Sequence, residues 1–232
     1  MTQSPLVTVT VCARDGAHWV KECLDAIHAQ THRPLEIIAV NDGSSDSTGA
    51  LMDQWKQSNA DSEVSISILH QDALGLSAGR MNALEAAQGE WVAITDIDVR
   101  PEQDWIEHLL LANEPVGEET IVAITGRTIF QTHTDIVSRF RAVEIASKYR
   151  SRPRRTSLAN GPCSMFKRQA LLDVGGFDPT WYHAEDMEVS LKLISQGGSI
   201  VYAPEAVVAH LPESGRKRFL AKRSRDARAH VR

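Results

Sequence analysis

Short apolar runs alternate with segments of helical apolar spacing through the first hundred residues. The runs predict strands at 6–11, 35–40, 64–69 and 91–95. Apolar residues three and four positions apart predict helices at 19–27, 47–57 and 77–87. Because strands and helices alternate along the chain, the pattern predicts an α/β domain with a parallel sheet covered by helices.

The second half of the chain has a less regular pattern. It predicts strands at 121–125 and 163–166, and one or two strands within 200–211. It also predicts an amphipathic helix at 136–149, a basic loop at 151–155, a turn at 175–179 and a helix at 185–194. Since no internal repeat or low-complexity stretch divides the chain, we expect one domain with at most a modest appendage.

Composition supports a folded protein. The 232 residues include 42% hydrophobic and 24% charged residues, a balance typical of globular domains rather than disordered chains. Cys12, Cys23 and Cys163 have neither zinc-site nor disulfide-framework spacing, which favours reduced thiols in a cytoplasmic protein. The sequence has no signal-peptide pattern and no run of ~18 apolar residues that would span a membrane.

Charge is distributed unevenly along the chain. Residues 213–232 include eight Lys or Arg and two acidic residues, although the whole chain has a net charge of −5. An acidic body with a basic tail does not match a nucleic-acid binder, whose basic face lies on the folded domain. The tail has three interpretations: it lies on the anionic inner face of a membrane, it is a solvated terminus, or it precedes membrane helices.

Polar clusters follow three of the predicted strands. They are Ala13-Arg14-Asp15, Asn41-Asp42-Gly43 and Asp96-Ile97-Asp98. The carboxyl ends of parallel strands meet at one edge of a sheet, where α/β proteins bind ligands. We therefore expect a functional site at this edge.

Asp96 and Asp98 directly follow a buried strand and are separated by one residue. Mg²⁺ and Mn²⁺ prefer oxygen ligands, and in proteins they commonly share one or two carboxylates with substrate phosphates. The pair can therefore hold a divalent cation and a ribose. The alternative is that the two acids belong to a solvated turn, where this spacing also occurs by chance.

Other candidate residues also have structural alternatives. Asp42 can accept from a base or a ribose, although its segment also resembles a turn with a helix cap. Glu185 and Asp186 begin a helix, where the helix dipole stabilises negatively charged side chains. Either residue can alternatively serve as a general base. His210 follows an apolar run and is either structural or a metal ligand. Arg80 follows a glycine-containing loop that can approach phosphates.

Six segments, taken together and in order, resemble the family 2 glycosyltransferases over about residues 5–210. They are VTVCARDGAHWVKECLDAIHAQ, LEIIAVNDGSSDST, GLSAGRMNALEAAQGEWVAITDID, NGPCSMFKRQALLDVGGFD, HAEDMEVSLKL and APEAVVAH. The resemblance implies a GT-A fold, which is Rossmann-like, with a mostly parallel central sheet flanked by helices and a smaller acceptor-side region. It divides a single domain, 1–212, into a nucleotide-binding half, 5–100, and an acceptor and catalytic half, 101–212.

The resemblance also implies roles on the donor side. Ala13 and Asp15 would line the nucleoside pocket, Asp42 would contact the base, and Arg80 would contact the base or the diphosphate. The family often has other residues at four nearby positions, Cys12, Arg14, Asp15 and Asn41. These departures leave the details of the nucleoside pocket open.

The resemblance implies a Mn²⁺ or Mg²⁺ cofactor on three further residues. Asp98 would be the main metal ligand, Asp96 would hold both ribose and metal, and His210 would match the metal-binding histidine near the end of GT-A domains. A divalent cation stabilises the charge that develops on a departing nucleoside diphosphate.

The catalytic and acceptor side is implied in the same way. Asn160 and Gly161 match the loop that faces donor and acceptor. Asp186 would be the catalytic base, and Glu185 would lie near the acceptor or the donor sugar. The signature of processive synthases is absent, so we expect addition of single sugars.

The expected function is therefore an inverting, metal-dependent transfer of sugar from a UDP- or GDP-sugar to a hydroxyl of a glycan, lipid or protein-linked glycan. Two alternatives remain. A sugar-phosphate nucleotidyltransferase would need a glycine-rich lysine signature that this N-terminus does not have. A nucleotide-sugar-binding scaffold without activity is disfavoured because Asp96, Asp98, Asp186 and His210 are all present.

Overall fold

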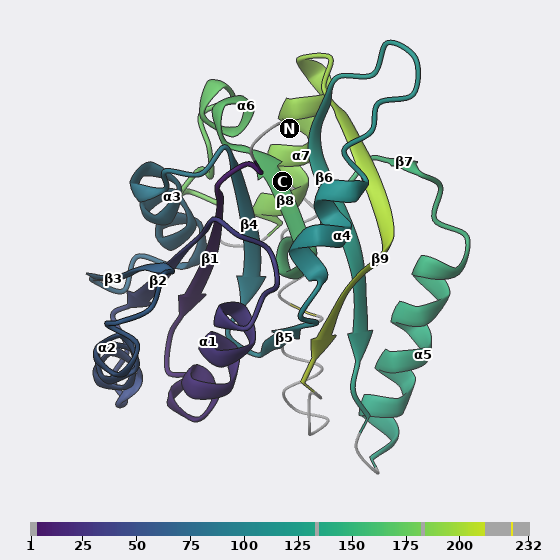
Figure 1. The fold of residues 1–232 in the computed structure, drawn as a ribbon. Helices are drawn as coiled ribbons and strands as arrows, with labels where there is room; N and C mark the ends of the chain where they lie inside the picture. Colours follow the sequence, from purple (N-terminus) through teal and green to yellow (C-terminus); the bar gives the residue numbers. More distant parts are fainter. Residues whose placement is uncertain (1–3, 133–134, 182–183, 212–223, 225–232) are drawn as a thin grey trace.

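The computed structural model describes residues 4–132, 135–181, 184–211 and 224. Within them the chain forms one nine-stranded sheet with helices on both faces (Figure 1). The strands are β1 Val7–Ala13, β2 Leu35–Asp42, β3 Ser65–Gln71, β4 Trp91–Asp96, β5 Val99–Pro101, β6 Ile121–Phe130, β7 Arg155–Thr156, β8 Ser164–Lys167 and β9 Ser199–His210. The α-helices are α1 Val20–His28, α2 Thr48–Ser58, α3 Leu76–Ala86, α4 Trp105–Leu111, α5 Ile136–Arg150, α6 Arg168–Asp173 and α7 Glu185–Ser195, and short 3₁₀ turns lie at Ala17–Trp19 and Gly161–Cys163.

The central strands are buried on both faces because their side chains alternate between two cores. In β4, Trp91 and Ala93 pack with α1, α2 and α4, whereas Val92 and Ile94 pack with α3, α6 and α7. In α1, the buried residues recur at helical spacing, as the sequence predicts. Burial on both faces fixes the strand register, and the register in turn fixes where each strand ends.

The first half of the chain, predicted to bind a nucleotide, forms the parallel part of the sheet. The strand order begins β3-β2-β1-β4, and these four strands are all parallel. Cys12 at the end of β1 pairs with Asp96, and Ala13 pairs with Asn41. The polar clusters after β1, β2 and β4 therefore lie at the same edge, and the predicted α/β class with a mostly parallel sheet is confirmed.

The second half completes the sheet with mixed strand directions. The order continues β8-β6-β9-β5, where β8 is antiparallel to both β4 and β6, and β6 is parallel to β9. The region predicted at 200–211 is one strand, and it pairs Val99 of β5 with His210. The helices α4 and α6 and the short strands β5 and β7 had no prediction from the sequence.

The helix predicted at 136–149 is present as α5, but its apolar face is not buried as an amphipathic helix predicts. Its large apolar residues Ile136, Phe140 and Val143 are exposed, whereas Ser138 and Arg141 are buried. Among the described residues no helix combines the length and apolarity needed to cross a membrane. The basic tail predicted at 213–232 lies outside the described residues, apart from residue 224.

Candidate active site

Asp42 at the end of β2 fixes the loop that precedes α3. Its carboxylate is 4% exposed and accepts hydrogen bonds from the Gln71 side chain and from the backbone N–H groups of Leu74 and Gly75. The chain turns sharply after Asp42, at Gly43, which has φ of +59°. The turn requires glycine, because a Cβ at position 43 would lie 2.4 Å from the backbone nitrogen of Ala73. Asp42 therefore has a structural role, since its carboxylate fixes this loop at the carboxyl edge of the sheet.

Asp15 performs a similar structural task one strand away. It has φ of +51°, and its Oδ1 accepts from the backbone N–H of Ser45 at 2.7 Å and from the Ser45 hydroxyl at 3.0 Å. These hydrogen bonds lower the pKa of Asp15. Ala13, directly before this turn, is 3% exposed at the end of β1. Both predicted pocket residues thus lie at the rim, and Asp15 joins the ends of β1 and β2.

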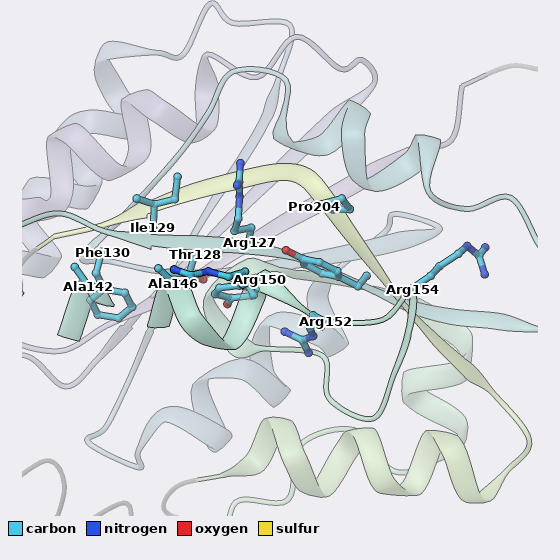
Figure 2. Close-up of a pocket in the computed structure, with 12 residues that line it drawn as sticks. Arg127, Thr128, Ile129, Phe130, Ala142, Ala146, Arg150, Arg152, Arg154 and Pro204 are labelled. Atoms are coloured by element: carbon cyan, nitrogen blue, oxygen red, sulfur yellow. The ribbon is translucent and has the colours of Figure 1, made fainter. Parts of the chain in front are cut away.

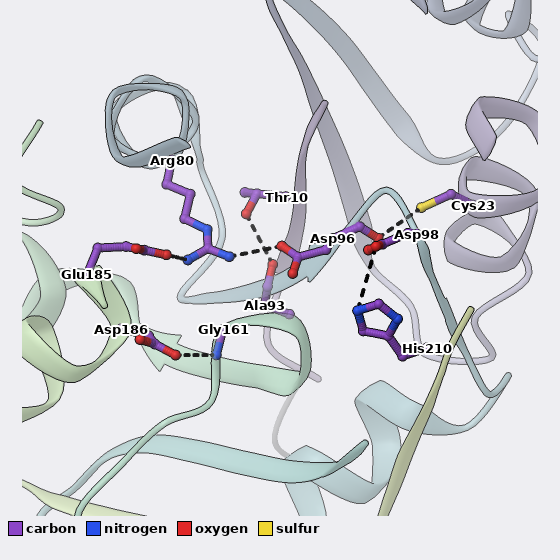
Figure 3. A network of polar contacts seen from close by, with 10 residues as sticks. All are labelled: Thr10, Cys23, Arg80, Ala93, Asp96, Asp98, Gly161, Glu185, Asp186 and His210. Carbon is purple, nitrogen blue, oxygen red and sulfur yellow. Dashed lines mark hydrogen bonds and ion pairs between the residues drawn. The ribbon is translucent and has the colours of Figure 1, made fainter. Parts of the chain in front are cut away.

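Arg80 on α3 joins two of the predicted acids. One side of its guanidinium pairs with Glu185 on α7, and Nη2 lies 2.9 Å from Oδ1 of Asp96 (Figure 3). Burial by itself would lower the pKa of Arg80, but Glu185 and Asp96 raise it above its ordinary value. Burial raises the pKa of Glu185, and Arg80 opposes that shift. Arg80 is therefore a buried structural link between Asp96 at the end of β4 and Glu185 at the start of α7.

Gly161 brings its loop, predicted to face donor and acceptor, against Arg80. A Cβ at position 161 would lie 3.0 Å from Nη2 of Arg80, so any larger residue would displace the guanidinium or the loop. The backbone N–H of Gly161 donates to Oδ2 of Asp186 at 3.1 Å, and the N–H of Met187 donates to Oδ1 at 2.9 Å. Two backbone donors thus fix the orientation of the Asp186 carboxylate beside the Arg80–Glu185 pair.

The thiol of Cys12 lies among the same groups. Burial raises its pKa to about 12, and its environment also includes the charges of Arg80, Asp96, Asp42 and Glu185. Titratable residues therefore lie close together at the carboxyl edge of the sheet, and they come from β1, β2, β4, α3 and α7.

Asp98 and His210 come together where β5 pairs with the end of β9. Nε2 of His210 lies 3.6 Å from Oδ2 of Asp98. Figure 3 shows the imidazole facing the carboxylate of Asp98, which lies next to Asp96. The Nδ1 side of the ring lies 2.7 Å from the carbonyl of Leu211. If Nδ1–H donates to that carbonyl, the Nε2 lone pair is directed toward Asp98, the tautomer that a metal-binding histidine needs.

Aromatic packing holds this imidazole in place. Phe130 at the end of β6 stacks on His210 with ring centroids 4.3 Å apart and an interplanar angle of 15°. The guanidinium carbon of Arg141 lies 5.2 Å from the centroid of Phe130. The sequence did not indicate Phe130, because nothing in the chain shows that β6 extends to the end of β9.

The Asp98–His210 pair suits a divalent cation. Carboxylate oxygen and imidazole nitrogen bind Mn²⁺ or Mg²⁺ at about 2.1 Å, so two adjacent ligands of one ion lie roughly 3 Å apart. A small closure of the 3.6 Å gap gives this geometry. The described residues contain no cluster of three His, Cys, Asp or Glu that could hold a metal. Asp96 contacts Arg80 rather than completing such a cluster, so phosphate and water oxygens would supply the remaining ligands.

Asn160 connects the acceptor-side loop to α5. Its Nδ2 donates to the hydroxyl of Tyr149 at 2.9 Å and to Oγ1 of Thr128 at 3.1 Å. Tyr149 borders a cavity of about 920 Å³ between α5 and the sheet. Like Phe130, Tyr149 was missed by sequence reasoning, since it occurs in an ordinary helical pattern.

Comparison with known proteins identifies a family. Residues 8–175 match the family described as Glycosyl transferase family 2. The pre-mycofactocin glycosyltransferase of Mycobacterium tuberculosis is 28% identical over 211 residues, which cover 88% of this chain and 42% of that protein. The chain thus spans less than half the length of this curated relative.

Solved structures share the fold. The mannosyltransferase PcManGT from Pyrobaculum calidifontis, in complex with GDP-Man and Mn²⁺, superposes with a TM-score of 0.75 at 24% identity, covering 99% of this chain and 64% of that one. GalNAc-T7 with UDP, GalNAc and Mn²⁺ superposes with a TM-score of 0.69 at 15% identity, covering 91% and 44%. These likenesses confirm the predicted GT-A architecture.

Proposed function

The chain belongs to glycosyl transferase family 2, and we propose that it transfers a sugar from a UDP- or GDP-sugar to an acceptor hydroxyl with inversion at the anomeric carbon. The observation that carries this proposal is the position of the Asp98–His210 pair. The pair lies at the carboxyl edge of the sheet beside Asp96, which Arg80 connects to the acceptor-side acid Glu185.

The donor side is built from the ends of β1, β2 and β4. We assign Ala13, Asp15 and Asp42 to the nucleoside pocket, and Asp96 to the ribose. The complexes of PcManGT with GDP-Man and of GalNAc-T7 with UDP support a nucleotide-sugar donor. Arg80 has both ends of its guanidinium occupied by carboxylates, so its role is to position Asp96 and Glu185 rather than to bind the diphosphate directly.

Asp98 and His210 would hold Mn²⁺ or Mg²⁺ together with the donor. When bound, the cation stabilises the negative charge of the leaving nucleoside diphosphate. The Mn²⁺ in both neighbouring structures supports this assignment. His210 suits the role because its imidazole is 5% exposed and is packed against Phe130, which limits its motion.

Asp186 is the proposed base. It takes the proton from the acceptor hydroxyl as that oxygen attacks the anomeric carbon, and a single displacement inverts the configuration. Its carboxylate is held by the N–H groups of Gly161 and Met187, so it is oriented before the acceptor arrives. Glu185 is 5% exposed and paired with Arg80, so it positions its neighbours instead of exchanging protons.

The acceptor is a hydroxyl of a glycan or of a lipid-linked molecule. The loop at Asn160 and Gly161 lies between Asp186 and α5, so the acceptor enters from the second half of the chain. Single sugar addition agrees with the absence of the processive signature from the sequence.

The proposal is tested by ligand screening followed by turnover. Thermal-shift assays with UDP, GDP, dTDP and their sugars, each with Mn²⁺ and with EDTA, should show one nucleotide class that stabilises the protein in a metal-dependent way. Mass spectrometry with that donor and a panel of glycan and lipid acceptors should then show transfer. Absence of any metal-dependent nucleotide binding would overturn the proposal.

A further inference from the structure

The cavity beside α5 has a distinctive wall. It lies between α5, the end of β6, the segment leading into β7, and β9 (Figure 2). Its lining includes the aromatic side chains of Phe130, Tyr149 and Tyr202 together with arginines. Among the residues that the structure describes, no Asp or Glu lines it, although the chain as a whole has net negative charge.

Arg152 is the most constrained of these cations. Its Nε donates to Oγ1 of Thr156 at 3.1 Å and its Nη2 donates to the carbonyl of Leu158. Its guanidinium carbon lies 5.7 Å from the ring centroid of Tyr149 and 5.3 Å from that of Tyr202. All of these partners are neutral, so the side chain is held in place while its charge is not neutralised.

A second cation, Arg150, also lines the cavity, although this residue is exposed. Figure 2 shows its side chain extending along α5 toward Ala146. The ion pairs of this region, among the described residues, join Arg141 and Lys148 to Glu144, and Arg154 to Glu119. None of them includes Arg150 or Arg152. Burial lowers the pKa of Arg152, and no carboxylate opposes this shift. An anion bound beside the guanidinium would stabilise its charged form.

The cavity is connected to the proposed base by a short chain of contacts. The hydroxyl of Tyr149 accepts from Asn160, and the next residue, Gly161, donates to Asp186. A molecule in the cavity therefore contacts the residue that holds the loop at Asp186. This places the cavity on the acceptor side of the site rather than beside the nucleoside.

We propose that this cavity binds an anionic group of the acceptor, either a phosphate or a carboxylate, through Arg150 and Arg152, while the tyrosines pack against the adjoining part of the molecule. The inference rests on the proposed function, since it names the class of acceptor for that site. Guanidinium groups match both anions because their N–H donors can bind two oxygens side by side.

The test uses small probes and the full chain. Phenyl phosphate, phenylacetate and neutral benzyl alcohol are titrated by NMR or calorimetry in EDTA, so that no metal ion at Asp98 and His210 can hold the phosphate. At least one anion should bind more tightly than benzyl alcohol. Tighter binding of phenyl phosphate would indicate a phosphate on the acceptor, and tighter binding of phenylacetate would indicate a carboxylate. Arg150→Gln should weaken binding of that anion by about tenfold, equivalent to ~1.4 kcal/mol, because it removes one of the two guanidinium groups proposed to bind the anion.

Two matched variants complete the design. Arg150→Lys should retain most of the affinity, and Arg139→Gln, an exposed change on the same helix outside the cavity, should leave it unchanged. Equal binding of charged and neutral probes, or equal effects of Arg150→Gln and Arg139→Gln, would overturn the inference. Nucleotide binding with Mn²⁺ is measured separately. If it persists while the anions fail to bind, this inference fails and the proposed function stands.

Discussion

Arg80 and Glu185 form an ion pair inside the protein, where their side chains are only 3% and 6% exposed. The pair joins α3 to the start of α7, and the second contact of Arg80, with Asp96, joins both helices to the end of β4. A cation at this point allows two acids to lie close together where β4 and α7 meet. Their separation is thus set by the fold before any substrate binds.

Arg80→Gln should destabilise the protein by about 3–5 kcal/mol, because it leaves the buried Glu185 and the partly exposed Asp96 without their cation. Burial already raises the pKa of Glu185 above 4.5, and loss of Arg80 removes the group that opposes this. A raised acid pKa makes the folded state bind protons more tightly, so stability falls as pH rises above 4.5 through the folded-state pKa. Urea unfolding should show a larger loss at pH 8 than at pH 5.

The double variant Arg80→Gln, Glu185→Gln is the control for that experiment. It removes the titrating carboxylate, so most of the added pH dependence should disappear. A single variant with the same stability loss at both pH values would show that Glu185 is not the group involved.

Asp98→Ala should abolish the metal-dependent part of nucleotide stabilisation, because it removes the carboxylate that faces His210 at 3.6 Å. Thermal shifts with Mn²⁺ and with EDTA should become equal. Asp61→Asn, an exposed change at the end of the α2 region, should behave like the unmodified protein. A full Mn²⁺ response in Asp98→Ala would exclude this residue as the main ligand.

Asp186→Asn should keep nucleotide and metal binding but reduce transfer by about 10²- to 10⁴-fold, the usual contribution of a general base. The amide retains an oxygen for the Gly161 or Met187 N–H, so the loop should keep its shape. Steady-state rates with the identified donor and acceptor measure the loss, and Asp173→Asn, an exposed acid on α6, serves as the control. An active Asp186→Asn enzyme would remove Asp186 as the base.

The sequence predicts the parallel half of the fold well because each strand there is a continuous apolar run that is buried on both faces. It also identifies Asp98 and His210, through their resemblance to a family pattern, and the structure brings them together. The contacts of Arg80 are different in kind. From the sequence, a cation after a glycine-containing loop suggests phosphate binding. Only the packing of α3 against α7 and β4 shows that the guanidinium of Arg80 is already paired with two carboxylates.

The second half was harder to predict for physical reasons. The short strand β5 has three residues and no periodic signal, yet it determines where Asp98 meets β9. The pattern of α5 suggests a buried apolar face, but the helix instead buries Arg141 against Phe130 and leaves Phe140 exposed. Local periodicity cannot reveal such contacts, because they depend on which distant element covers the helix.

Phe130→Leu should weaken Mn²⁺ binding by about tenfold, because it removes the ring that orients His210. Electron paramagnetic resonance of free Mn²⁺, titrated with protein and the identified nucleotide, measures this without turnover. Ile129→Leu changes the neighbouring residue, which is 45% exposed, and should have no effect. Unchanged affinity in Phe130→Leu would show that the stacking is incidental to metal binding.

At most one of the three thiols should react with Ellman's reagent at pH 8 in the folded protein. Cys23 and Cys163 are buried, and burial raises the pKa of each to about 12, so neither forms the thiolate that reacts. All three should react rapidly in urea. Rapid reaction of two thiols under native conditions would contradict the packing of α1 or of the 3₁₀ turn at Gly161–Cys163.

The pairing of Val99 with His210 has a consequence for how the protein can change over evolution. Side chains alternate between the faces of a strand, so inserting or deleting one residue in β9 would turn the imidazole to the opposite face. Substitutions along β9 leave this pairing in place, whereas a change of one residue in length close to His210 would move the imidazole away from Asp98.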